Sequence, residues 1–497
     1  MKERILKTSL HGCITTAEQA CALIHDGMTV AMSGYAMAGY PKAVVQELVR
    51  RKKNGEALTI NLITGANVPY LDELLGAEQL ISRRTPMCAS RTLADQINQG
   101  SVSYVEQQMN KMPRLLRSGS FGKIDIAVVE ALGLGEKGEL IPTTSSGMTY
   151  HLMQAAEKII IEINTAQPES LAELHDIFIP SAPPHARPIP LVRTSQRIGN
   201  PYIPIDPDKI VAIIETNIPE RSAAQTQGTP ETDLIARHLF DFLELELATH
   251  FAGTLPPIQL GFGSIANSVA SAFRHSGFRD LEFFCGGIGE PIIELLSCGK
   301  ALAVSTGGLE MTEHVEQVIK QTAGLHDRLV IRNGDMTNNA ELIGRLGVLA
   351  LNTGIEVDIY GNVNSSHING NRILNGIGGG ANFAQNAGLS VILIPSTSKA
   401  GKISTIVPMV SHQDICEHDV DILVTEHGVA DLRGLDDTER ADAIITRCTN
   451  GAYQEQLSAY LSQARKAGGG HHPQSQEAAF AWYRQLKENG TMLEDRP

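Results

Sequence analysis

Short apolar runs that read as strands alternate with helix-like runs along almost the whole of this 497-residue chain. The run Ile159–Ile163 is apolar on both faces of the strand it would form, apart from Glu162. Strands of this kind are covered on both sides, as in sheets flanked by helices. Such alternation is typical of parallel sheets with crossover helices. The pattern therefore predicts an α/β fold with mostly parallel sheets.

The composition fits this prediction. Hydrophobic residues make up 42% of the chain and charged residues 19%, which is enough apolar material to bury a core and argues against disorder. Glycine is abundant, at 46 residues, whereas aromatic residues are scarce, at 5%. Many glycines suit tight turns between strands and helices, so we expect an α/β enzyme and not an all-β binding module.

Charge and cysteine content exclude several kinds of partner. The formal net charge is −14 and no Lys/Arg-rich block occurs, which argues against nucleic-acid binding. The seven cysteines are scattered, without CxxC or paired Cys/His spacing, so we expect neither a disulfide framework nor a metal site. The pair His471–His472 lacks other ligands at a supporting spacing. No apolar run is long enough to span a bilayer and the first residues lack an apolar signal core, so we expect a cytoplasmic protein without membrane contact.

Local signals place helices, strands and a boundary. Thr16–Gln19 reads as a capping box, and Pro41 suits the first position of a helix that continues over Ala43–Lys53. The polar stretch Asn217–Glu231 separates two α/β series. We therefore predict two similar open α/β domains, over residues 1–220 and 221–497. The predicted strands are Met28–Met32, Leu58–Thr64, Ile124–Val129, Ile159–Ile163, Ile210–Ile214, Ile258–Gly261, Leu281–Cys285, Leu302–Ser305, Leu329–Ile331, Val348–Leu351, Leu389–Ile394 and Val420–Val424.

Two glycine-rich segments contrast in what surrounds them. Gly133–Gly138 matches the dinucleotide fingerprint GxGxxG, but the residues after it do not start a helix, and a helix N-terminus must face the pyrophosphate. We therefore do not expect NAD binding. Gly261–Ile265 joins a strand to an apolar-faced helix, where glycines and free helical N–H groups suit an anion. A simple tight turn explains this segment equally well.

Two further glycine-rich turns lie later in the chain. Asn375–Phe383 has four glycines in five residues, which suits a backbone-lined pocket for a phosphate, a pantetheine amide or an oxyanion; a structural turn is the alternative. Cys285–Pro291 connects a strand to a helix, and Glu290 is placed to cap that helix and to interact with its dipole. From local chemistry, capping explains Glu290 better than catalysis does.

Several motifs together resemble the class I CoA transferases of the acetyl-CoA hydrolase/transferase family, which includes propionyl-CoA:succinate and succinyl-CoA:acetate CoA transferases. The resemblance covers nearly the whole chain, and its combined motifs are highly specific. The motifs are Ser33–Tyr35, Gly39–Ala43, Gly261–Ile265, Asp358–Asn362, Asn364–His367, Asn375–Gly380, Gly401–Met409 and Thr425–Gly434.

The resemblance implies two open α/β domains, a homodimer, and CoA bound mainly by the second domain. It implies that Gly379 offers a backbone N–H to the thioester oxyanion as well as a contact to CoA. In the family an active-site glutamate attacks the acyl-CoA thioester and passes CoA on through a glutamyl-CoA thioester. It implies no cofactor other than CoA or acyl-CoA as substrate. The residues placed in contact with CoA are Gly261, Phe262, Gly263, Ser264, Ile265, Asn375, Gly379 and Lys399.

One departure from the family pattern concerns the nucleophile. Counting back without gaps from Gly299–Lys300 puts the family's glutamate position on Gly286, which has no side chain. Four hypotheses remain open: Glu290 supplies the carboxylate, Cys285 acts as a thiol, the protein promotes hydrolysis or direct acyl transfer without a covalent intermediate, or it binds CoA without turnover. A buried strand-end cysteine is the simpler explanation of Cys285.

The sequence as a whole predicts an acyl-CoA-dependent transferase that moves CoA between a short-chain acyl-CoA and a small carboxylate. Direct acyl transfer or hydrolysis by a modified enzyme is the first alternative, and a non-catalytic CoA-binding protein is the second. The candidate catalytic residues are Glu290, Cys285 and Gly379. We expect acyl-CoA and a small acceptor as partners.

Overall fold

A computed structural model describes residues 1–221, 227–251 and 253–494. The chain divides into two compact units. Residues 280–346 belong to the first unit, whereas the boundary predicted at residue 220 assigned them to the second half. The first unit comprises Met1–Ala224, Asp280–Leu346 and Leu374–Asn382, and the second comprises Gln225–Arg279, Gly347–Ile373 and Phe383–Pro497.

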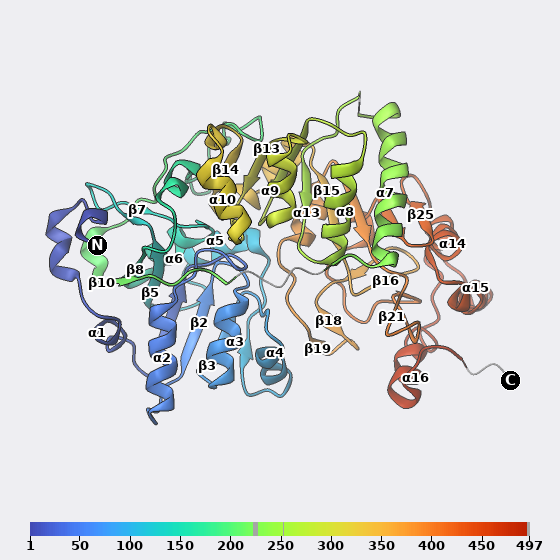
Figure 1. Cartoon of the computed structure of the whole chain (residues 1–497). Coiled ribbons are helices and arrows are strands. Elements are labelled where there is room, and N and C mark those ends of the chain that lie inside the picture. The colour runs from blue at the N-terminus through green and yellow to red at the C-terminus, as the bar shows by residue number, and fades with distance from the viewer. Residues whose placement is uncertain (222–226, 252, 495–497) are drawn as a thin grey trace. The chain divides into compact units, whose positions relative to one another are not determined.

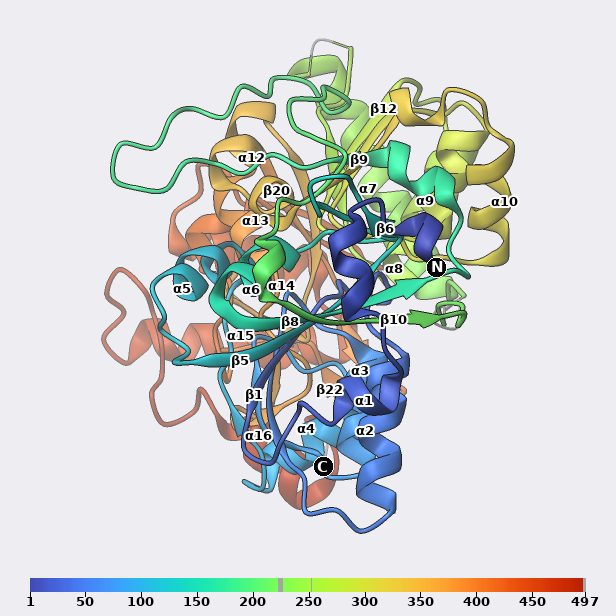
Figure 2. The same ribbon diagram turned by 90° about the vertical axis from the view of Figure 1, so that its left-hand side faces the viewer.

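The first unit contains a seven-stranded parallel sheet in the order β10-β8-β5-β1-β2-β3-β4. Figure 2 shows β5, β8 and β10 lying next to one another. Helix α2 packs against α1 and α3 (Figure 1). The strands are β1 Thr29–Met32, β2 Ile60–Thr64, β3 Ile81–Thr85, β4 Ser103–Tyr104, β5 Ile124–Ala131, β8 Ala156–Asn164 and β10 Ile210–Thr216, and the helices are α1 Ala17–Cys21, α2 Ala43–Lys53, α3 Pro69–Ala77, α4 Arg91–Asn98, α5 Met112–Arg117 and α6 Thr149–Ala155.

The core of this unit forms where apolar strand residues meet α6. Ile159 and Ile161 of β8 and Ala127 of β5 are fully buried together with Leu152 and Met153 of α6. Burial of such side chains contributes about 1.5–3 kcal/mol each. The continuous apolar runs therefore form central strands, as the sequence pattern predicts.

A second group of parallel strands in the first unit has the order β12-β13-β14-β9. Strand β9, His175–Asp176, pairs with β14, which ties residues 280–346 to the N-terminal part of the chain. The remaining elements are β12 Leu281–Cys285, β13 Ala301–Thr306, β14 Leu329–Arg332, α9 Glu290–Ser297, α10 Glu313–Gln321, α11 Gly334–Thr337 and α12 Ala340–Leu346.

The second unit has its own strands in the order β11-β15-β20-β24-β25, all parallel except the last pair. No helix in the described ranges is long and apolar enough to cross a membrane. The main elements are β11 Ile258–Leu260, β15 Leu349–Thr353, β20 Leu389–Leu393, β24 Ile422–Thr425, β25 Gly428–Asp431, α7 Pro230–Thr249, α8 Ser264–His275, α14 Asp437–Cys448, α15 Gly451–Lys466 and α16 Ala481–Asn489.

The α/β fold with large, mostly parallel sheets is confirmed, and three local predictions can be compared with the structure. The Thr16 capping box is present. The prediction for Pro41 was wrong, because α2 begins at Ala43 and Lys42 is its N-cap residue. Within Gly133–Gly138, Gly133–Leu134 forms strand β6, which pairs antiparallel with β7, Leu140–Ile141. The hairpin explains why no helix follows these glycines.

Candidate active site

The turn after β12 contains Gly286, where the sequence predicts that the family's glutamate is replaced. Gly286 accepts a hydrogen bond from the Gly307 N–H at 2.8 Å. A Cβ atom placed on Gly286 would overlap the hydroxyl of Tyr35 and would lie 3.7 Å from Nδ2 of Asn338. The Tyr35 phenol therefore occupies the space that a side chain at position 286 would need.

Tyr35 comes from the loop that follows β1. Its backbone exchanges hydrogen bonds with Ala38, and its hydroxyl accepts one from Nδ2 of Asn338 at 3.4 Å. Burial raises the pKa of Tyr35 to about 12, so the phenol is neutral near pH 7. The group beside Gly286 is thus a neutral hydroxyl that can donate a hydrogen bond, and not a carboxylate.

Glu290 and Cys285 flank this turn in different environments. Glu290 is the first residue of α9, and the N-cap residue is Gly289. No side chain caps this helix by a hydrogen bond, so the predicted capping role of Glu290 was wrong. Its carboxylate instead accepts a hydrogen bond from Oγ1 of Thr312 at 2.5 Å, in a first helical turn where the dipole favours negative charge. Cys285 ends β12 and is fully buried.

The glycine-rich segment around Gly379 also lies in the first unit. The Asn375 carbonyl accepts from the Tyr104 hydroxyl at 3.3 Å, and the Gly378 carbonyl accepts from the Met109 N–H at 3.1 Å. A Cβ on Gly376 would lie 2.7 Å from the Tyr104 hydroxyl, so that position has no room for a side chain. The loop is therefore held close to the surrounding backbone, as its glycine content suggests.

Asn338 links this loop to the Gly286 turn. Nδ2 of Asn382, in helix α13 (Gly380–Asn386), donates to the Asn338 carbonyl oxygen at 3.0 Å. The side chain of Asn338 meanwhile contacts the Tyr35 hydroxyl beside Gly286. Gly379, which directly precedes α13, thus lies in a segment joined to the Gly286 turn through one buried asparagine.

The other predicted CoA residues lie in the second unit. Gly263 has a φ of 114° and is the N-cap residue of α8, which starts at Ser264. A Cβ on Gly261 or Gly263 would meet no atom within 4 Å, and Phe262 is 47% exposed. Lys399 is exposed, with a φ of 49°. This turn is open to a ligand and presents the N-terminal N–H groups of α8.

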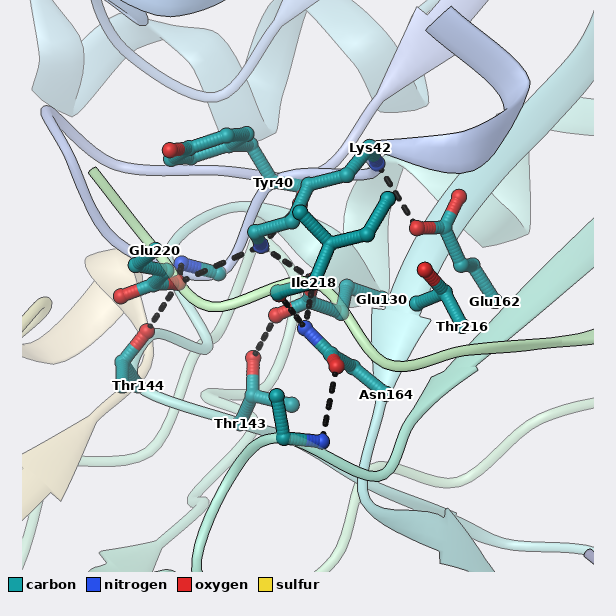
Figure 3. Close-up of polar contacts among 12 residues, drawn as sticks. Tyr40, Lys42, Glu130, Thr143, Thr144, Glu162, Asn164, Thr216, Ile218 and Glu220 are labelled. Carbon is teal, nitrogen blue, oxygen red and sulfur yellow. Dashed lines mark hydrogen bonds and ion pairs between the residues drawn. The ribbon is translucent and has the colours of Figure 1, made fainter. Parts of the chain in front are cut away.

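A buried cluster of charged residues holds the loop that carries Tyr35 (Figure 3). Nζ of Lys42 forms an ion pair with Glu130 and donates to the Tyr40 carbonyl oxygen at 2.9 Å. Oε1 of Glu220 lies 3.7 Å from Nζ and accepts from the Gly39 N–H at 2.5 Å. The side chains of Lys42, Glu130 and Glu220 are at most 1% exposed. These contacts fix both the end of the loop and the start of α2.

Glu162 completes the cluster by capping α2. Its carboxylate accepts from the backbone N–H groups of Lys42, Ala43 and Val44 at 2.8–3.2 Å. Burial, and then the charge of Glu130, raises the pKa of Glu162 to about 7. Burial lowers the pKa of Lys42, but Glu130 and Glu220 outweigh burial, so its net pKa is raised. Lys42 therefore stays charged and neutralises part of the cluster.

Sequence reasoning did not identify this cluster. Glu130 and Glu162 appear in the sequence as acidic residues within apolar strands, which was the available signal. Ionised residues are seldom fully buried unless they are paired, so each needed a partner from elsewhere in the chain. The identity of that partner, Lys42, depends on the tertiary fold.

Comparison with known protein families identifies the family of this chain. The model of the acetyl-CoA hydrolase/transferase N-terminal domain matches residues 3–215, and that of the C-terminal domain matches residues 317–461. The chain belongs to the acetyl-CoA hydrolase/transferase family. It is 38% identical over 499 residues to succinyl-CoA:acetate CoA-transferase of Clostridium kluyveri, covering 99% of this chain and 92% of that protein.

Other relatives include both transferases and hydrolases. Propanoyl-CoA:succinate CoA transferase of Escherichia coli is 37% identical, with 96% of this chain and 98% of that protein covered. Acetyl-CoA hydrolase of Saccharomyces cerevisiae is 34% identical, with 100% of this chain and 98% of that protein covered. The chain is thus an enzyme of this family, and its relatives' names cover two reaction types.

Solved structures show the same fold at lower sequence identity. RipA from Yersinia pestis superposes with a TM-score of 0.70 at 19% identity, over 92% of this chain and 98% of that one. A 4-hydroxybutyrate CoA-transferase from Porphyromonas gingivalis has a TM-score of 0.63 at 19% identity, over 92% of this chain and 99% of that one. These likenesses support the α/β fold assignment.

Proposed function

We propose that this protein transfers CoA from a short-chain acyl-CoA to a small carboxylic acid. The single observation that carries the proposal is the full-length similarity to a succinyl-CoA:acetate CoA-transferase, with both family domains present. The glycine turns at Gly261–Ile265 and Asn375–Gly379 support it, because open or tightly held backbone suits CoA and a thioester oxyanion. Lys399 offers a cation to a CoA phosphate.

We propose that the acceptor carboxylate itself attacks the thioester. In the first step its oxygen bonds to the acyl carbon and the C–S bond breaks, giving a mixed anhydride and the CoA thiolate. In the second step the thiolate attacks the acceptor's carbonyl carbon, which forms the new thioester and releases the donor acid. Neither step forms a covalent bond between the acyl group and the enzyme. We propose that the Gly379 N–H stabilises the oxyanion in each step.

Three observations favour this route over an enzyme nucleophile. Gly286 has no side chain, and Tyr35 occupies the space where one would lie. Cys285 is fully buried, so its thiol is inaccessible to a bulky thioester. Glu290 is engaged by Thr312. A neutral Tyr35 hydroxyl beside Gly286 can donate a hydrogen bond there without repelling an acceptor carboxylate.

Initial-rate kinetics test the route. Direct attack requires both substrates to be bound together, so we expect intersecting double-reciprocal plots with acetyl-CoA and succinate. We also expect intact-mass spectra to show no glutamyl-CoA or acyl-cysteine adduct after borohydride or hydroxylamine treatment. Glu290→Gln and Cys285→Ala should keep more than about a tenth of kcat. Parallel plots, or an adduct lost in one of these variants, would show instead that this residue is the nucleophile.

Thioester hydrolysis is a second candidate because Gly286 is partly exposed, so water can reach this turn. CoA release from acetyl-CoA at an equal rate with and without an added acid would favour it. Absence of CoA binding and turnover would contradict both activities. We also propose a cytoplasmic homodimer, on the family resemblance alone; light scattering after size exclusion tests the dimer.

A further inference from the structure

A cavity of about 310 Å³ lies in the first unit beside Asn338. It is lined by α5, by the segment 180–189 and by the residues around α11 and α12. Helices α5 and α12 are labelled in Figure 2. Pockets for small molecules start at about 300 Å³, and one water molecule takes about 30 Å³ in the liquid. The cavity is thus large enough for an acid of four to six carbons together with some water.

The charges around this cavity favour an anion. Three arginines line it, namely Arg114, Arg117 and Arg187, and within the described part of the chain none of them forms an ion pair. The two acidic residues in its wall already have partners. Oδ2 of Asp335 lies 2.7 Å from Nε2 of His151, and Glu341 pairs with Arg345. Three guanidinium groups therefore remain without a carboxylate.

The inner wall of the cavity reaches the candidate reaction position. Asn338 is 1% exposed and lines the cavity, and its amide oxygen has no hydrogen-bond partner among the residues that the structure describes. Its Nδ2 lies 3.7 Å from where a Cβ on Gly286 would be. An unpaired buried amide is costly unless a ligand or water completes it. If the amide oxygen and nitrogen of Asn338 are exchanged, Oδ1 accepts from the Tyr35 hydroxyl, and the NH₂ group in the unpaired position can donate to the carboxylate of a ligand.

We propose that this cavity binds the acceptor acid, with one carboxylate near Asn338 and a second near Arg114, Arg117 and Arg187, so that the enzyme prefers dicarboxylic to monocarboxylic acceptors. The inference rests on the proposed function, because it names the acceptor class for the same site. A monocarboxylate cannot occupy both ends of the cavity. A second carboxylate gains charge-assisted hydrogen bonds from planar guanidinium groups.

Calorimetric titration of the full-length protein with succinate and with acetate, each with and without CoA, tests the site directly. We expect succinate to bind at least about tenfold more tightly than acetate, and Arg114→Gln, Arg117→Gln and Arg187→Gln each to weaken succinate binding about three- to tenfold. Arg193→Gln is the matched control, since Arg193 is an exposed arginine that does not line the cavity. Equal succinate affinity in wild type and all three variants would overturn the proposal.

Kinetics separate failure of this site from failure of the proposed function. The three variants should raise KM for succinate while leaving KM for acetyl-CoA and for acetate unchanged. If no acid accepts CoA but succinate still binds in an arginine-dependent way, the transferase function fails and the site stands. If transfer occurs and the variants keep the wild-type preference for succinate, the site fails and the function stands. If the variants instead lose affinity for adenosine 3′,5′-bisphosphate, the cavity binds CoA phosphates and the proposal is wrong.

Discussion

The first unit holds positive charge in two different settings. Lys42 is fully buried and is surrounded by Glu130, Glu220 and backbone carbonyl oxygen, so its charge is neutralised within the protein. The three arginines of the cavity are exposed, and among the described residues none of them pairs with a carboxylate. A buried, paired charge holds the chain in one arrangement, whereas an exposed, unpaired group of cations is available to a ligand. The two regions should accordingly respond to mutation in opposite ways.

The largest effect on stability is expected from Lys42→Met. Removal of one partner leaves buried carboxylates without a counter-charge, which costs about 3–5 kcal/mol. Urea denaturation measures this change. The matched control is Lys53→Met at the other end of α2, where the lysine is 61% exposed and pairs with Glu78 at 3.2 Å; it should change stability by less than about 1 kcal/mol. If Lys42→Met folds poorly, the double variant Lys42→Met/Glu130→Gln should recover part of the loss.

The contact between Gly286 and Tyr35 should give the next largest effect. Gly286→Ala forces a methyl group against the Tyr35 hydroxyl, and overpacking of this kind costs about 1–3 kcal/mol. Removing the hydroxyl in Gly286→Ala/Tyr35→Phe should recover most of that cost. Equal destabilisation in the single and double variants, measured by urea denaturation, would contradict the contact.

The buried cluster should also make stability depend on pH. Burial raises the pKa of Glu220 from 4.5 to about 7, so the folded protein binds a proton in this interval that the unfolded chain releases. The free energy of unfolding should therefore fall as the pH rises from 4.5 to 7. In Glu220→Gln this fall should be smaller by on the order of 1 kcal/mol. A pH profile parallel to that of wild type would show that Glu220 is ionised throughout.

The smallest effect on stability is expected in the cavity. Arg114→Gln should change the free energy of unfolding by less than about 0.5 kcal/mol, because the side chain is exposed and forms no ion pair within the described ranges. The same variant should nevertheless weaken succinate binding, as measured by calorimetry. A loss of stability comparable to that of Lys42→Met would show that Arg114 is structural and would remove the contrast between the two regions.

Much of the fold could be predicted from local pattern alone. Helix Ala43–Lys53 and strand Leu281–Cys285 have the predicted bounds, because amphipathic and apolar periodicity is a property of neighbouring residues. Family membership likewise followed from short motifs such as Gly261–Ile265 and Asn375–Gly380. The assignment of the family's glutamate position to Gly286 also used only the sequence, by ungapped counting, and it stays a prediction.

Tertiary structure decided which distant residues meet. Tyr35 lies 251 positions before Gly286 in the chain (286 − 35), yet its hydroxyl occupies the space beside that glycine. The burial of Lys42 against Glu130 and the grouping of Arg187 with Arg114 likewise join segments that are distant in sequence. Secondary structure depends on neighbours along the chain, but electrostatic partners and ligand cavities depend on how strands and loops are brought together in space. The sequence therefore determined the α/β fold and the family of this protein, and only the fold decided which charges are neutralised internally and which remain available to a substrate.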